Sequence, residues 1–216
     1  MALQLRVYVP PHPLIKHWLA VARDESTPSM LFRSAMTELG RWLTYEAIRD
    51  WLPTMETSIQ TPLSGCPATF INPEVPIAIV PVLRAGLALL DGAQALLPLA
   101  SIYHIGLVRD EETLEPSCYL NKFPDEFNPN TRLLISEPML ATGGSIIVVL
   151  NELVKRGIDP ALIRIISVVT APAALQKIGE TYPALSIYAA TIDEGLNEKG
   201  FIVPGLGDAG DRTFGT

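Results

Sequence analysis

The order of hydrophobic and polar positions along the chain predicts alternating helices and strands. Residues 28–51 place apolar side chains at the 3.6-residue spacing of an amphipathic helix, at Phe32, Ala35, Met36, Leu39, Trp42, Leu43, Ala47, Ile48 and Trp51. A shorter helix is predicted before it, over residues 14–23. Further along the chain, runs rich in valine and isoleucine predict buried strands, and helical patterns between them predict helices. The strands are predicted at 76–82, 100–108, 132–138, 162–172 and 185–192, and the helices at 86–98, 144–157 and 173–183.

This alternation predicts an α/β fold with a mostly parallel sheet and helices on both faces. The predicted strands lack polar alternation, as expected for a sheet that is covered on both sides. Neither an internal repeat nor a linker interrupts residues 1–216, so we expect a single domain. Residues 109–132 differ from the rest because they are long, charged and rich in proline, and such a connection is usually a functional flap or a hairpin.

Charge and composition narrow the range of partners. The chain has 216 residues, with 16 Lys plus Arg against 23 Asp plus Glu, so the formal net charge is −7. It has no basic block, so we expect no nucleic-acid partner, and an anionic ligand must be bound locally. No apolar stretch reaches the roughly 18 residues that a membrane-spanning helix needs, so no membrane association is expected. Cys66 and Cys118 lie far apart without a metal-binding pattern, which favours a reduced, cytoplasmic protein.

One loop has the composition of a phosphate site. The predicted strand at 132–138 carries Glu137 at its end, and the chain then runs through Thr142, Gly143, Gly144 and Ser145 into a predicted helix. Glycines let backbone N–H groups approach an anion, the hydroxyls add donors, and the helix N-terminus favours negative charge. A phosphate monoester fits best, although an ordinary capped helix is the alternative for this motif by itself. No lysine follows the glycines, which excludes the loop of nucleoside triphosphatases.

Two further motifs are candidates for ligand binding. Arg84 follows a predicted strand directly and can clamp a diphosphate, although a surface arginine at a turn is the commoner explanation. The segment GLGDAG at 205–210 matches a dinucleotide motif only formally, because six residues follow it and no helix has room to form the rest of that site. Asp208 and Asp211 nevertheless favour a binding loop over a flexible tail.

Five motifs in order, PVLRAG, VRDEETLEP, EPMLATGGS, EGLNEKGFIVPGLGDAGD and the terminal FGT, make the chain resemble the uracil phosphoribosyltransferases. The resemblance covers nearly the whole chain, starting at HPLIKHWL. It implies the type I phosphoribosyltransferase fold, with a small hood formed by parts of the N-terminal segment and the C-terminal loop, and with 109–132 as the flap. The implied reaction, a step of pyrimidine salvage, converts uracil and phosphoribosyl diphosphate (PRPP) to UMP and pyrophosphate.

The resemblance also implies roles for individual residues. The implied catalytic residues are Glu137, Asp208, Arg84 and Arg109. PRPP binding is implied for Arg84, Arg109, Glu137, Pro138, Met139, Leu140, Ala141, Thr142, Gly143, Gly144, Ser145 and Asp208, and uracil binding for Ile202, Gly207, Asp208 and Ala209. Mg²⁺ is the implied cofactor, bound mainly through PRPP and water without a direct protein ligand. The family forms homodimers or homotetramers, and GTP activates some of its members.

The chain departs from the family pattern at two positions. Glu137 stands where the family usually has Asp, and Phe201 where it usually has Tyr, which removes a phenolic donor. Two other interpretations stay open. One is a regulatory protein on the same fold that senses PRPP or UMP without turnover. The other is an enzyme for guanine or xanthine, although such enzymes usually carry an acidic residue where this chain has Ala141.

Overall fold

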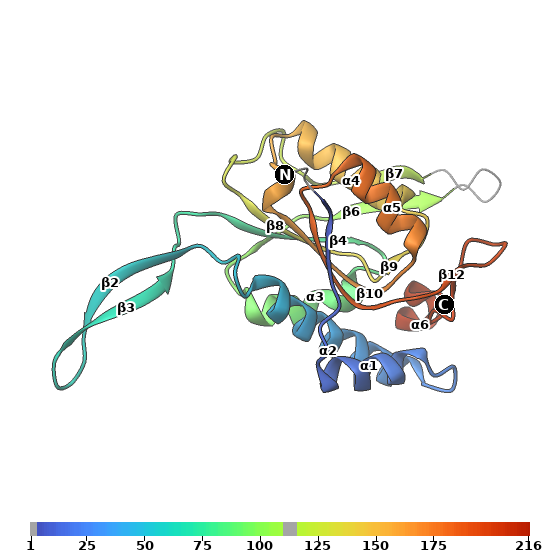
Figure 1. Cartoon of the computed structure of the whole chain (residues 1–216), viewed down its shortest axis with the longest axis horizontal. Helices are drawn as coiled ribbons and strands as arrows, with labels where there is room; N and C mark the ends of the chain where they lie inside the picture. Colours follow the sequence, from blue (N-terminus) through green and yellow to red (C-terminus); the bar gives the residue numbers. More distant parts are fainter. Residues whose placement is uncertain (1–3, 110–115) are drawn as a thin grey trace.

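The computed structural model describes residues 4–109 and 116–216, and a mixed but mainly parallel sheet of nine strands forms its centre (Figure 1). Only the pairing of β6 with β7 is antiparallel among the pairs of this sheet that the structure describes. The strands run in the order β1 (Arg6–Tyr8), β11 (Ser186–Ile192), β10 (Ile163–Thr170), β8 (Arg132–Ser136), β4 (Ile77–Leu83), β6 (Ile105–Arg109) and β7 (Pro116–Asn121), with β5 (Ser101–Ile102) beside β4 and β9 (Met139–Leu140) beside β10.

Helices cover both faces of this sheet, as the sequence pattern predicts (Figure 1). On one face lie α1 (Pro13–Arg23), α2 (Ser29–Ile48) and α3 (Leu87–Leu96), and on the other lie α4 (Gly144–Lys155) and α5 (Pro172–Thr181). A short 3₁₀ helix, η1 (Pro160–Leu162), precedes β10. Each face has its own apolar core, and β10 is buried along its whole length because both cores pack against it. The predicted α/β fold is therefore confirmed.

The predicted strand at 100–108 is two strands, β5 and β6, and a proline in the neighbouring strand explains the interruption. Both strands pair with β4 in one register, Ala78 with Ser101 and Val82 with Ile105. Between these pairs, Tyr103 donates to the carbonyl of Ile79 at 3.0 Å. The next bond would need an N–H from Pro81, which proline lacks. The ladder therefore stops for two residues and resumes at β6.

The sequence pattern did not predict several elements that the structure contains. The strands β2 (Thr54–Gln60) and β3 (Gly65–Ile71) form a hairpin that projects from the body of the molecule, and every residue of β2 is exposed (Figure 1). At the C-terminus, β12 (Gly195–Leu196) pairs with β13 (Ile202–Val203), and α6 (Ala209–Phe214) follows. The range 109–132 contains the last residue of β6 and all of β7, which pairs antiparallel with β6, whereas residues 110–115 lie outside the described part of the structure. In residues 4–109 and 116–216, no helix combines the length and apolarity needed to cross a membrane.

Candidate active site

The predicted site residues converge where two neighbouring strands end. After β4 the chain continues to β6, which lies on one side of β4, whereas β8 lies on the other side. Such a change of direction opens a crevice at the carboxyl edge of a parallel sheet. A cavity of about 220 Å³ occupies this place. Five predicted site residues line it, namely Arg84, Glu137, Met139, Ser145 and Asp208, together with Val82, Leu83, Ala85, Leu107 and Gly210. A larger cavity of about 570 Å³ lies beside β1 and the end of α2, and none of the predicted site residues lines it.

The predicted phosphate loop, residues 139–145, contains β9 and runs into the first turn of α4. Gly143 stands just before the helix in the left-handed region, with φ of 78°, which a side chain would strain. Gly144 is the first helical residue, and its N–H donates to Thr142 Oγ1 at 3.4 Å. A Cβ at Gly144 would meet its nearest atoms at 3.6 Å, so nothing in the protein itself requires glycine there. Its bare backbone therefore fits an anion that approaches the helix N-terminus.

Three residues of the predicted PRPP site have buried side chains. Pro138, Leu140 and Ala141 pack into the protein interior, and the structure does not place their side chains in the cavity. Their backbone ties the loop to β10 and α5, because the carbonyl of Pro138 accepts from Val168 at 2.9 Å and that of Leu140 from Ala171 at 2.8 Å. These residues set the position of the loop.

The two predicted diphosphate arginines differ in what the structure describes. Arg84 follows β4 through a cis peptide bond after Leu83, and its side chain is 55% exposed. Its guanidinium donates to Asp211 Oδ1 in α6 at 2.9 Å, which links the end of β4 to the C-terminal segment. Arg109 ends β6, but its side chain lies outside the described part of the structure.

The base loop, residues 202–209, joins β13 to α6. Gly207 has φ of 79°, and Asp208 caps α6 by accepting from the Asp211 N–H at 3.0 Å. Gly207 and Asp208 are exposed, whereas Ile202 and Ala209 are buried, so the last two can offer a ligand only their backbone. The Asp208 cap joins the loop directly to the helix α6 that follows it.

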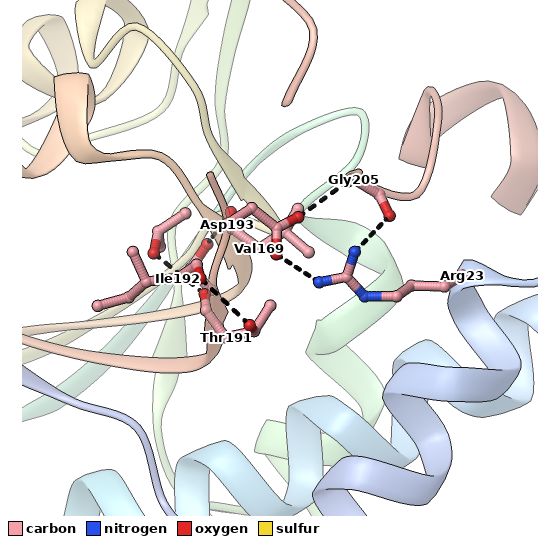
Figure 2. Close-up of polar contacts among 8 residues, drawn as sticks. Arg23, Val169, Thr191, Ile192, Asp193 and Gly205 are labelled. Atoms are coloured by element: carbon pink, nitrogen blue, oxygen red, sulfur yellow. Dashed lines mark hydrogen bonds and ion pairs between the residues drawn. The ribbon is translucent and has the colours of Figure 1, made fainter. Parts of the chain in front are cut away.

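Sequence reasoning missed three residues that hold the base loop. Figure 2 shows Arg23, from the last turn of α1, between the Asp193 carboxylate and the Gly205 carbonyl. Arg212, in α6, donates to the carbonyl of Leu206 at 2.8 Å. A signal for Asp193 was present, because this carboxylate directly follows the strand predicted at 185–192, and Glu137 likewise stands at the end of a predicted strand. For the two arginines no local pattern pointed to the loop.

The cleft fits a metal ion that a substrate brings with it. Among the described residues no three His, Cys, Asp or Glu side chains are grouped as a metal site. Glu137 and Asp208 do place carboxylates on the same small cavity as Arg84. Mg²⁺ prefers oxygen ligands and usually keeps several waters, so this donor set suits an ion bound mainly by phosphate oxygens and water.

Together, a mainly parallel sheet with a cleft at its carboxyl edge, a glycine loop that opens a helix, and an arginine beside two carboxylates define a type I phosphoribosyltransferase. A family model described as uracil phosphoribosyltransferase matches residues 9–216. The chain belongs to the uracil phosphoribosyltransferase family, whose members are pentosyltransferase enzymes.

The similarity to known proteins extends over all or nearly all of the chain. A uracil phosphoribosyltransferase of Nostoc sp. is 72% identical over 216 residues, which is 100% of both chains. A chloroplastic uracil phosphoribosyltransferase of Arabidopsis thaliana is 54% identical and covers 99% of this chain, which spans 72% of that protein. The solved structure of the AQ2163 protein from Aquifex aeolicus has a TM-score of 0.86 at 37% identity, with 96% of this chain and 97% of that chain covered.

Proposed function

We propose that the protein transfers the 5-phosphoribosyl group of PRPP to uracil and releases UMP and pyrophosphate. The observation that carries this proposal is the single cavity that Arg84, Glu137, Ser145 and Asp208 share at the carboxyl edge of the sheet. It sits beside the bare N-terminus of α4, so a ribose phosphate can span from the glycine loop to the arginine. Family membership supports the choice of uracil as the base.

In this reaction the bond between the anomeric carbon and the pyrophosphate oxygen breaks, and a bond from uracil N1 to that carbon forms. Uracil N1 loses its proton, and the transition state gathers positive charge on the ribose. Arg84 neutralises the departing diphosphate, while Glu137 accepts hydrogen bonds from the ribose hydroxyls and faces the cationic ring. No protein nucleophile is needed, and the residues act by position and charge. Mg²⁺, when bound, adds charge neutralisation at the diphosphate beside Glu137 and Asp208.

Recognition of the base follows from the backbone of Gly207, Asp208 and Ala209. Uracil presents an acceptor, a donor and an acceptor along one edge, which main-chain N–H and C=O groups can match. Cytosine would place its exocyclic amine against a backbone donor. An unpaired buried polar group costs about 1–3 kcal/mol, so cytosine is rejected.

The projecting hairpin supports a homodimer or homotetramer. Met55, Ile59, Phe70 and Ile71 expose large apolar side chains on β2 and β3. A two-stranded hairpin in water is marginally stable by itself, so a second copy of the chain is the surface that we propose for it. In the same proposal α1 and the C-terminal segment form the hood, GTP is a candidate effector, and the two free cysteines support a cytoplasmic location.

The decisive experiment mixes the purified protein with PRPP, Mg²⁺ and uracil and measures UMP. We expect UMP from uracil and no nucleotide from cytosine, guanine or xanthine, and we expect EDTA to abolish turnover. Equal use of cytosine would refute the base assignment, and undiminished turnover in EDTA would refute the role of the metal. Binding of PRPP or UMP without any product would favour the regulatory protein on the same fold.

A further inference from the structure

A pair of opposite charges holds the start of the base loop from outside the cleft. Asp193 follows β11 and is almost fully buried, with 3% of its side chain exposed, and Arg23 is 24% exposed. The Asp193 carboxylate accepts from Arg23 through one oxygen and from the Gly205 N–H through the other, at 2.9 Å. Arg23 donates in addition to the Gly205 carbonyl at 3.0 Å, as Figure 2 shows. Both backbone polar groups of Gly205 are therefore occupied by this pair.

The pair itself is anchored to the sheet and to α1. The Asp193 N–H donates to the carbonyl of Thr170, at the end of β10, at 2.8 Å. Arg23 is the last residue of α1, a helix whose Ile15 and Ala22 are fully buried in the core. The lock, as we name Arg23 with Asp193, therefore ties the base loop to the end of β10 and to α1.

A second arginine holds the next peptide group. Arg212 donates to the Leu206 carbonyl at 2.8 Å and to the carbonyl of Asp24 at 2.6 Å. Its guanidinium lies 4.3 Å from the ring centre of Phe32, which is fully buried in α2. Arg212 therefore joins the end of α1 to the loop, one residue after the point where Arg23 holds it.

These contacts set the direction of two successive peptide planes. In a trans peptide the C=O and the N–H point in opposite directions. With the Gly205 and Leu206 carbonyls turned toward Arg23 and Arg212, the N–H groups of Leu206 and Gly207 point the opposite way. Gly207 has φ of 79° and, as glycine, would tolerate the plane in either orientation. The arginines supply the constraint that the glycine does not.

We propose that Arg23, held by Asp193, and Arg212 are positioning residues for base selectivity. They keep a backbone donor, and not a carbonyl, at the end of the loop that meets the base. A flipped plane would present an acceptor, which suits the amine of cytosine better than the carbonyl of uracil. This inference rests on the proposed function and adds the residues that enforce its choice of base.

The test uses conservative variants and a matched control. Arg23→Lys keeps the charge toward Asp193 but loses the forked second bond to Gly205. Arg156→Lys is the control, because Arg156 is 20% exposed and also bonds both a carboxylate and a carbonyl, those of Glu152, in α4. For both variants the KM for uracil, the KM for PRPP, kcat and the melting temperature are measured. Asp193→Asn and Arg212→Lys are measured in the same way.

We expect Arg23→Lys to raise the KM for uracil about tenfold or more, the scale of one lost charge-assisted hydrogen bond, with the KM for PRPP unchanged. The preference for uracil over cytosine should fall, and hydrogen exchange over residues 203–208 should become faster. Arg156→Lys should lower the melting temperature without either effect. Equal changes in both KM values, or a protected loop with unchanged KM in Arg23→Lys, would overturn the inference.

The proposed function is judged separately, by the wild-type protein. If the wild type forms no UMP, the proposed function fails. Hydrogen exchange then still decides whether Arg23 holds the loop, since it needs no substrate. A loop that exchanges at the wild-type rate in Arg23→Lys and in Arg212→Lys would remove both arginines from their positioning role, whether or not the enzyme is active.

Discussion

The phosphate loop and the base loop line one cleft but are built differently. The phosphate loop, 139–145, takes its turn from neighbours in the sequence, since Gly143 lies in the left-handed region and α4 begins directly after it, and backbone bonds to Val168 and Ala171 fix its position. The base loop, 202–209, is held by Arg23, whose bond to Gly205 joins residues 182 positions apart. One loop is therefore a local strand, turn and helix, and the other is shaped by distant side chains.

This difference suits the two kinds of recognition that we propose, the binding of a phosphate and the selection of a base. A phosphate is the same in every phosphoribosyl donor, and a helix N-terminus with bare glycine backbone is enough to bind it. A base must be distinguished from close analogues by the direction of single backbone groups, and a glycine loop does not hold that direction by itself. Long-range ion pairs and carbonyl contacts provide it.

The largest expected effect comes from Gly144 in the phosphate loop. A valine there would place its branched side chain where the phosphate approaches, and each charge-assisted hydrogen bond lost is worth about 1.5–3 kcal/mol. Gly144→Val should therefore bind PRPP more than about a hundredfold more weakly, as measured by calorimetry. The Cβ has room in the protein itself, at 3.6 Å from its nearest neighbours, so the variant should fold. Unchanged PRPP affinity in a folded variant would move the phosphate site elsewhere.

Glu137 comes next, because it lines the same cavity as residues of both loops. Glu137→Gln keeps the size and removes the charge, and turnover should fall roughly 10²-fold or more, as when one preorganised electrostatic group is lost. Glu137→Asp should retain most of the activity, since the shorter carboxylate is the usual residue of the family. Both turnover and melting temperature are measured. A Gln variant with normal turnover and lowered stability would mean that Glu137 only supports the loop.

Variants of Asp208 distinguish a structural role of this residue in the base loop from a role in the reaction. Its carboxylate caps α6 through the Asp211 N–H at 3.0 Å, and it also lines the cavity. Asparagine caps helices as well as aspartate does, whereas alanine costs about 1 kcal/mol at such a position. Asp208→Asn should therefore lose activity at wild-type stability, and Asp208→Ala should lose both, as denaturant unfolding and turnover would show. Full activity in the Asn variant would mean that Asp208 serves only as the cap of α6.

The smallest expected effect concerns an ion pair that lies outside both loops. It tests whether a pair at such a place changes only the stability of the protein and leaves substrate binding unchanged. The hydrogen bond from Arg164 lowers the pKa of Asp50 below its usual value, although burial opposes this. A lowered folded-state pKa means stability that is present above the unfolded pKa of about 3.9 and is lost as the pH falls through the folded value. Asp50→Asn should cost at most about 1 kcal/mol at neutral pH, because Asp50 is 71% exposed. The difference between the thermal melts of the two proteins should begin to shrink only below about pH 4 and should vanish once the pH is below the lowered folded-state pKa of Asp50, and the KM for uracil should stay unchanged.

The sequence by itself determined the architecture and the chemistry of the phosphate loop. Helix periodicity and unbroken valine and isoleucine runs are local signals, so the extents of α2, α4, β8 and β10 could be read within a few residues. The resemblance to the family implied that Arg84 and Glu137 share one site, and the structure brings them to one cavity because parallel strands end at the same edge of the sheet. The roles of individual residues came from the resemblance to a family.

Only the tertiary structure decided the rest, because it depends on contacts that no local pattern carries. The exposed hairpin of β2 and β3 has no buried face to produce alternation, and the interruption between β5 and β6 depends on Pro81 in a neighbouring strand. Arg23 and Asp193 lie 170 positions apart, and each looks like an ordinary charged residue at the end of its own element. Folding brings them together at Gly205, and there they hold the loop that we propose as the base-binding loop.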